Sequence, residues 1–428
     1  MVRKLIALAM IAAPLLAQSY ATHGDAALAG YIEQAIERNP ALSESVARYR
    51  AALQRIPQVT SLPDPMLDVR NDIRSPETRV GPQMIMLSIS QQFPWFGKLD
   101  ERGKVAAKEA DAVRQLYEVR KAEIVRQVKL AYFDVAFVDR ALRIREEESA
   151  LLDHFATLAE ARYSQGVGLQ QAVVKLQAEI TRVRSEIENL KRQRVDAEAA
   201  LNALLDRSPT TPVPPVELRR PASPPLDLET LYARGRDNRP ELKAQFAEIE
   251  MNEKRIHAAR KEYWPDVTIG AGYTNVAPRR DEPGRMNPPP DNGKDIYNVV
   301  VGINIPIRRR KRDAAVMEAT EDFLAAREGY RGATIGIEAS IRAIAFRLRT
   351  IAEQASLYEK VLLPQTEQAL SSTEAAYSTG SLGVLELLDS ERMLLDARLG
   401  LAQFESDQWK TMAEMERAIG SPFPEATP

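Results

Sequence analysis

The chain has 428 residues, of which 44% are hydrophobic, so it is long and apolar enough to bury a sizeable core. It contains no cysteine, which excludes disulfides and thiolate metal sites. Its 58 Lys and Arg residues nearly balance 60 Asp and Glu residues, and the net charge of −2 gives no electrostatic case for nucleic-acid binding.

The first 21 residues have the features of a secretory signal peptide. Arg3 and Lys4 supply the positive start, residues 5–17 are apolar, and a small-x-small cleavage site ends at Ala21. The apolar run is shorter than the roughly 20 residues that a membrane-spanning helix needs. We therefore predict that residues 1–21 direct export, and that the mature chain carries neither a transmembrane helix nor a lipid on cysteine.

The first half of the mature chain, residues 22–208, is predicted to be mostly helical. Apolar residues recur every three or four positions over long stretches without proline, which is typical of coiled-coil helices. The expected elements are a helical segment over 25–56, strands at about 65–74 and 83–92, and long helices at about 97–163 and 169–205.

A linker over residues 209–225 is too rich in proline for a helix or a central strand. The second half, residues 226–428, follows the same plan as the first. The expected elements are a helical segment over about 227–261, strands at about 265–275 and 296–306, and long helices at about 311–377 and 384–419.

Five landmarks occur twice in the same order, which predicts two structural repeats. Two repeats favour a pseudo-symmetric protomer over a solenoid, which needs at least three. The pairs are Asn39-Pro40 with Arg239-Pro240, Pro63-Asp64 with Pro265-Asp266, Phe93-Pro94 with Ile305-Pro306, Tyr163-Ser164-Gln165-Gly166 with Tyr377-Ser378-Thr379-Gly380, and Ser208-Pro209 with Ser421-Pro422.

The four expected strands alternate apolar and polar residues. Each is about ten residues long, the length with which a tilted strand crosses a bilayer, although a sheet with one solvated face shows the same pattern. Four strands cannot close a barrel, and unpaired edges in lipid cost several kcal/mol for each backbone group. If these strands enter a membrane, several copies of the chain must share one barrel.

The stretch Gln91-Gln92-Phe93-Pro94-Trp95-Phe96-Gly97-Lys98-Leu99, together with the repeats and the strand pairs, resembles the TolC-like outer-membrane efflux factors of tripartite pumps. The resemblance covers residues 25–422, and Leu62-Pro63-Asp64-Pro65-Met66-Leu67 is most similar to the branch that serves heavy-metal exporters. It implies a mainly α fold with a small β part. Three copies would form a twelve-stranded outer-membrane β-barrel and a periplasmic α-helical barrel.

The same resemblance implies a passive channel that is not an enzyme and holds no cofactor. Its implied partners are two further copies of the chain, a periplasmic adaptor (membrane fusion protein), an inner-membrane transporter and outer-membrane lipid. Heavy-metal cations are the favoured substrate. An organic-compound efflux channel and a periplasmic adaptor are the alternatives.

Both turns between long helices are expected at the periplasmic tip, where the resemblance places adaptor docking. The predicted docking residues are Val167, Gly168, Leu169, Gly380, Leu382 and Gly383. Glu386 and Asp389, three residues apart on one helix face, are predicted to form an acidic entrance with Tyr377 as part of the gate. The arginine–aspartate lock of some relatives is absent, because Leu382 and Val174 occupy those positions.

Other candidate sites are weaker. The three histidines are far apart in the sequence and lack the spacing of metal ligands, so no metal site is predicted. The basic run Arg308-Arg309-Arg310-Lys311-Arg312 directly follows the fourth strand. It is expected to reach lipid headgroups, or to be a solvated charged segment.

Overall fold

The structure is a computed structural model, and it describes residues 25–218 and 227–423. The expected signal peptide lies outside these residues. The chain divides into two compact units, which we call the hairpin unit and the strand unit. The hairpin unit comprises the described residues within Met1–Ser45, Glu118–Leu242 and Ala333–Pro428, and the strand unit comprises Val46–Tyr117 and Lys243–Gly332.

Helices dominate the described residues, which confirms the predicted mainly α class. Within this part of the chain, no helix is both long and apolar enough to cross a membrane. The long helices are α3 (Lys98–Ser164), α4 (Gln170–Leu204), α8 (Arg309–Leu357), α9 (Leu363–Thr379) and α10 (Val384–Ile419). The described part of the proline-rich linker, residues 209–218, contains neither helix nor strand.

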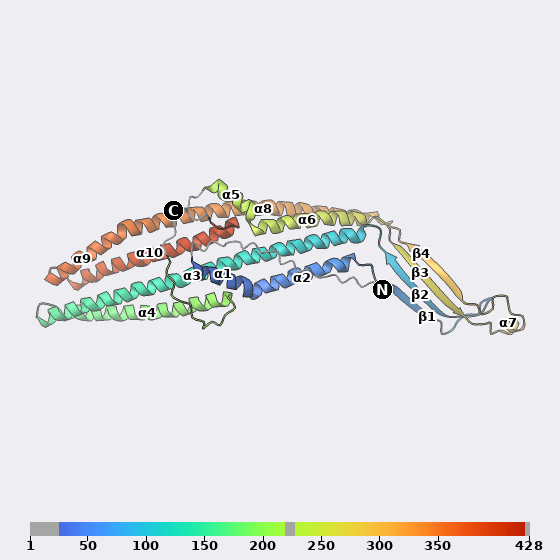
Figure 1. The fold of residues 1–428 in the computed structure, drawn as a ribbon, viewed down its shortest axis with the longest axis horizontal. Coiled ribbons are helices and arrows are strands. Elements are labelled where there is room, and N and C mark those ends of the chain that lie inside the picture. The colour runs from blue at the N-terminus through green and yellow to red at the C-terminus, as the bar shows by residue number, and fades with distance from the viewer. Residues whose placement is uncertain (1–24, 219–226, 424–428) are drawn as a thin grey trace. The chain divides into compact units, whose positions relative to one another are not determined.

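Four antiparallel strands form one sheet in the order β1-β2-β3-β4 (Figure 1). They are β1 (Met66–Asn71), β2 (Gln83–Phe93), β3 (Val267–Val276) and β4 (Ile296–Ile303). A short helix, α7 (Glu282–Met286), is part of the connection from β3 to β4. β4 ends three residues before the expected boundary: Asn304 pairs with Asp266 instead, and Pro306 has no N–H for the ladder.

The register of the sheet separates an apolar face from a polar one. One row across the four strands reads Leu67, Ile89, Ala271 and Val299, and the adjacent row reads Asp68, Ser88, Gly272 and Asn298. Large apolar side chains of the first face are exposed in the single chain. The sheet therefore has one face suited to an apolar medium and one suited to water, as the alternation predicted.

Both predicted segments at the start of the repeats are in fact two helices each. The first segment is α1 (Ala26–Arg38) and α2 (Pro40–Thr60), and the second is α5 (Leu228–Asn238) and α6 (Pro240–Lys261). At the breaks, Asn39 and Arg239 have extended ψ angles of 124° and 122°. The ring of the following proline disfavours the helical conformation of the residue before it, so each helix ends there.

The sequence predicted one helix over about 311–377, but the structure interrupts it. A π-helix, η1 (Tyr358–Leu362), separates α8 from α9, and the N–H of Leu363 donates to the carbonyl of Tyr358 five residues earlier. Pro364 explains the interruption. In a regular α-helix its ring would clash with the carbonyl of Lys360, four residues earlier, and it has no N–H to donate to that carbonyl. On α10, a Cβ at Gly400 would lie 2.5 Å from the Tyr358 ring, so the helices approach closely at this point.

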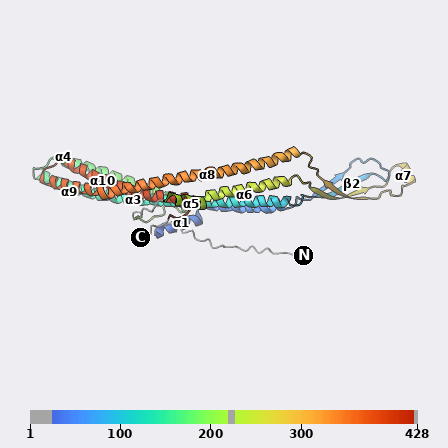
Figure 2. The same ribbon diagram turned by 90° about the horizontal axis from the view of Figure 1, so that it is seen from above.

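In the hairpin unit, α3 and α4 form one helical hairpin and α9 and α10 form another. Figures 1 and 2 show α9 beside α10, with which it shares many contacts. Side chains of all four helices form one buried cluster, including Phe155 of α3, Leu176 of α4, Leu370 of α9 and Leu387 of α10. This core holds the turns of the two hairpins together.

Candidate functional site

The first turn joins α3 to α4. The N–H groups of Val167 and Gly168 both donate to the carbonyl of Arg162, at 3.1 and 3.0 Å. A Cβ on Gly168 would lie 2.9 Å from the backbone nitrogen of Tyr163, so the turn has room only for glycine there. The turn leaves Val167 and Leu169 with 66% and 73% of their surface exposed.

The second turn joins α9 to α10. Gly380 ends α9 with φ of +85°, a left-handed conformation that residues with a Cβ rarely adopt. Its N–H donates to the carbonyl of Tyr377 at 3.1 Å, and Gly383 then starts α10 with an extended backbone. Leu382 is partly exposed between them. Both turns therefore present apolar side chains at their surface.

Arg162 links the two turns. Its Nη1 donates to the carbonyl of Tyr377, and its guanidinium carbon lies 5.1 Å from the centre of the Tyr377 ring. Tyr377 is only 5% exposed, and burial raises the pKa of its hydroxyl. The ring is therefore a neutral part of the core that fixes the second turn against α3.

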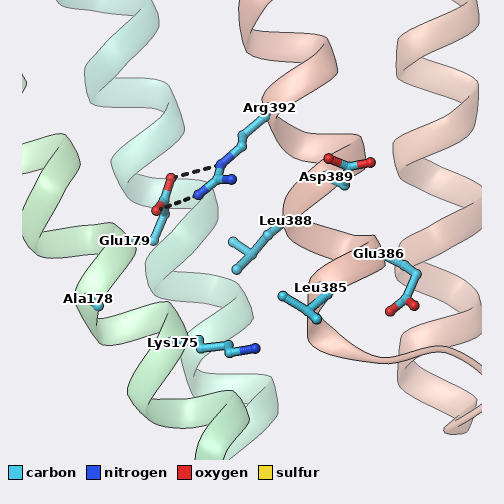
Figure 3. A pocket seen from close by; sticks show the side chains of 8 residues that line it. All are labelled: Lys175, Ala178, Glu179, Leu385, Glu386, Leu388, Asp389 and Arg392. Carbon is cyan, nitrogen blue, oxygen red and sulfur yellow. Dashed lines mark hydrogen bonds and ion pairs between the residues drawn. The ribbon is translucent and has the colours of Figure 1, made fainter.

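A pocket lies between α4 and α10, close to the turns in the sequence. Figure 3 shows Lys175 extending from α4, with Glu386 and Asp389 on α10. None of these three side chains forms an ion pair within the described part of the chain. The residues that line the pocket are Lys175, Ala178, Glu179, Leu385, Glu386, Leu388, Asp389 and Arg392.

One ion pair crosses this pocket between the two hairpins (Figure 3). The Nη2 of Arg392 donates to the Oε2 of Glu179 at 3.0 Å, and the Nε of Arg182 also donates to Glu179 at 3.0 Å. Burial alone raises the pKa of Glu179, but the hydrogen bonds from both arginines outweigh it and lower the pKa. Glu179 therefore stays ionised, and the Glu179–Arg392 pair joins α4 to α10.

The structure brings together only some of the residues predicted for the entrance. Glu386 and Asp389 line one pocket, whereas Tyr377 is buried in the core and is absent from that lining. Sequence reasoning missed Lys175 and the Glu179–Arg392 pair. The only signal on α4 is that Lys175 and Glu179 lie four residues apart on one helix face, which does not indicate contact with α10.

The chain thus combines long helical hairpins, a sheet with one apolar face and glycine-bearing turns. The model of the family "Outer membrane efflux protein" matches residues 31–207 and 231–421. The chain belongs to this family. It is an outer-membrane efflux channel, and its helical part lies in the periplasm.

Individual relatives are distant but match along most of their length. The chain is 19% identical to the cobalt-zinc-cadmium resistance protein CzcC of Cupriavidus metallidurans over 85% of this chain and 83% of that protein. It is 22% identical to the pyoverdine export outer membrane protein OpmQ of Pseudomonas putida, over 78% and 69% respectively. A crystal structure of CusC shares the fold, with a TM-score of 0.75, 18% identity and 92% of each chain covered.

Proposed function

We propose that three copies of this chain form a conduit through which metal cations leave the periplasm. An inner-membrane transporter would feed the conduit through a periplasmic adaptor. The observation that carries the preference for cations is the pair of unpaired carboxylates, Glu386 and Asp389, beside the second turn. Similarity to a cobalt-zinc-cadmium resistance protein supports heavy-metal cations as the substrate.

The net charge of the pocket sets the expected preference for cations over anions. Glu179 and Arg392 neutralise each other, which leaves two carboxylates and the Lys175 ammonium in each copy. Three copies would therefore place six carboxylates against three ammonium groups. A narrow opening with this excess of negative charge concentrates cations and raises the barrier to anions.

Neutralising the two carboxylates tests the proposal. Glu386→Gln with Asp389→Asn is expected to lower the permeability ratio of cations over anions by about tenfold, because a focusing field raises the local concentration of counter-ions. The measurement is the reversal potential of single channels in planar bilayers under a salt gradient.

The matched control is Glu160→Gln, which removes an exposed carboxylate of α3 that does not line the pocket. This control should keep the selectivity of the wild type. Channels whose selectivity is equal in all three proteins would contradict the acidic entrance. That result would favour export of an organic compound, the class of substrate named for the pyoverdine export protein.

The Glu179–Arg392 pair is proposed to hold the entrance closed in place of the lock that Leu382 and Val174 cannot form. Arg392→Gln removes the bond between α4 and α10, so we expect a higher open probability in single-channel recordings. Arg182→Gln is the matched control: it removes another partner of Glu179 but keeps the bond between the hairpins. Equal open probabilities in both variants would contradict the lock.

The exposed apolar turns are proposed to receive the adaptor. Val167, Leu169 and Leu382 are the large apolar side chains there, at 66%, 73% and 39% exposure. Gly168, Gly380 and Gly383 shape the turns that present them. Conduction of this kind is passive and needs no catalytic group.

A further inference from the structure

The two outer strands of the sheet each have one unpaired edge. Among the residues that the structure describes, the order β1-β2-β3-β4 leaves β1 and β4 with a neighbour on one side only. In an outer-membrane protein, an unpaired backbone group in the bilayer costs several kcal/mol, so both edges need a partner strand. In this four-stranded antiparallel sheet, β1 and β4 run in opposite directions. β4 of one copy can therefore pair with β1 of another in the same antiparallel way.

The internal repeat shows how residues of the two hairpins correspond. Aligning Pro63-Asp64 with Pro265-Asp266 places Met66 on Thr268, and aligning Phe93-Pro94 with Ile305-Pro306 places Ser90 on Gly302. The strands pair in this way: Met66 lies opposite Ser90, and Thr268 lies opposite Gly302. The two hairpins therefore share one register.

The β2–β3 pairing within the chain then serves as a template for the β4–β1 pairing between copies. Ile89 lies opposite Ala271 in the template. The corresponding residues are Val301 and Val69, so Val301 of one copy would lie opposite Val69 of the next. Both belong to the apolar face, so this register continues that face across the boundary between copies.

The template also contains a buried ion pair just beyond the strands. The Nζ of Lys98, in a residue that is 2% exposed, lies 2.8 Å from the Oδ1 of Asp266. The residues that correspond in the other repeat are Arg310 and Asp64. Both are exposed, and the described residues hold no ion pair for either. Four cations in the first turn of α8 also oppose the helix dipole, so helix stability does not explain them.

The template also contains an aromatic contact, and the two residues that correspond to it in the repeat are exposed and apolar. Trp95 and Trp264 stack with ring centres 5.5 Å apart. They correspond to Ile307 and Leu62, which are 79% and 48% exposed in the single chain. A strand edge, a charge pair and an apolar pair are thus all incomplete in one copy and complementary between two.

The pairing of β4 with β1 of the next copy follows from the proposed trimer. We propose that it has this register, and that Arg310 forms an ion pair with Asp64 of the next copy. The Ile307 side chain packs on Leu62 of the same neighbour. This pairing rests on the proposed trimer, and it assigns the residues through which the copies recognise each other at the base of the strands.

Cysteine pairs test the register, since the natural chain has no cysteine. Residues opposite each other on antiparallel strands have Cα atoms about 4.5 to 5.5 Å apart, within disulfide range. Val69→Cys with Val301→Cys should therefore join most chains into covalent trimers on a non-reducing gel. A bond within one chain is excluded, because three strand spacings, roughly 14 Å, separate β1 from β4.

The control for the register is Val69→Cys with Val300→Cys, because Val300 points to the opposite face of β4. It should give no covalent trimer. A wild-type protein that is trimeric but whose Val69→Cys/Val301→Cys variant does not cross-link would overturn the pairing alone. A wild-type protein that is monomeric in mild detergent would overturn the pairing and the proposed trimer together.

Charge exchange tests the ion pair. Asp64→Lys and Arg310→Glu should each lower the temperature at which the detergent-solubilised trimer dissociates, and the double variant should recover most of the loss. Asp64→Lys with Arg309→Glu is the matched control and should not recover it. Recovery by Arg309→Glu to the same extent, or no loss with Asp64→Lys, would overturn the assigned pair.

Discussion

Raising the pH from about 5 to 8 is expected to lower the thermal unfolding temperature of the protein, and Glu391→Gln is expected to weaken this dependence strongly. Glu391 of α10 is 2% exposed and lies beside Glu148 of α3, which is 5% exposed. Burial, followed by the nearby charges of Glu148 and Glu179, raises the pKa of Glu391 from 4.5 to about 8. Burial also raises the pKa of Glu148.

The surroundings of the two carboxyl groups favour a proton on Glu391. Oε1 of Glu148 and Oε2 of Glu391 are buried without a hydrogen-bond donor among the described residues. A proton on Glu391 would satisfy one of these oxygens and remove the repulsion between two buried charges. The other charged groups around the pair are Arg145, Glu147, Glu179, Arg182, Glu186, Arg392 and Arg398.

The sign of the effect follows from proton binding. Because the pKa of Glu391 is higher in the folded state, the folded state binds more protons than the unfolded state between pH 4.5 and 8. This contribution to stability is complete below pH 4.5 and is lost as the pH rises to about 8. The free energy of unfolding should fall by at most about 1.4 kcal/mol per pH unit in this window.

The measurement is thermal unfolding by circular dichroism at several pH values. Glu391→Gln should flatten the curve, since a glutamine stays neutral and its amide can donate to Glu148. Glu386→Gln is the control, because it removes an acid that is not part of this pair, and it should keep the wild-type slope. A Glu391→Gln protein that follows the wild-type slope would rule out Glu391 as the titrating group.

The sequence was sufficient for features that depend on local periodicity. Alternation along residues 83–92 identified both the strand and its apolar face, because successive side chains of a strand point to opposite sides. Periodicity of three and four residues likewise identified α3 and α10. The break at η1 was missed, although Pro364 carried the signal for it.

Features that depend on packing between distant segments were not predictable. The resemblance implied that Tyr377 is part of the gate, but no local pattern showed its contact with Arg162, over two hundred residues away. In the sequence, Glu391 is one of several acidic residues on a charged helix. Its proximity to Glu148 depends on the packing of α3 against α10. Lys98 and Asp266 were noted only as parts of separate motifs, because no local pattern shows that one binds the other.

The Lys98–Asp266 pair gives the other large expected effect, a strong loss of stability in Asp266→Ala. Asp266 accepts hydrogen bonds from the Lys98 ammonium at 2.8 Å and from the backbone N–H of Trp95 at 3.1 Å. It also pairs with Asn304, which follows β4. The alanine leaves the Lys98 ammonium, whose side chain is 2% exposed, with only the Oε2 of Glu262 at 3.3 Å.

Breaking a buried ion pair by removing one partner costs about 3 to 5 kcal/mol when the remaining charge is left uncompensated. The Glu262 carboxylate, 3.3 Å from the Lys98 ammonium, should reduce this cost. We therefore expect Asp266→Ala to lower the free energy of unfolding by up to about 3 kcal/mol, the lower end of this range. Asp266→Asn with Lys98→Met should cost much less, because methionine fills the volume of the lysine stem and no buried charge remains. The asparagine side chain can still accept from the Trp95 N–H.

Thermal and denaturant unfolding of the four proteins would complete this comparison, with Lys98→Met as the fourth. The order of stability should be wild type, the double variant, Lys98→Met and then Asp266→Ala, because Asp266 keeps its other donors when only the lysine is lost. If Asp266→Ala were as stable as the double variant, the Lys98 ammonium that has lost Asp266 would not be the cause of the loss. The junction between strands and helices would then depend on the backbone hydrogen bonds of Asp266 alone.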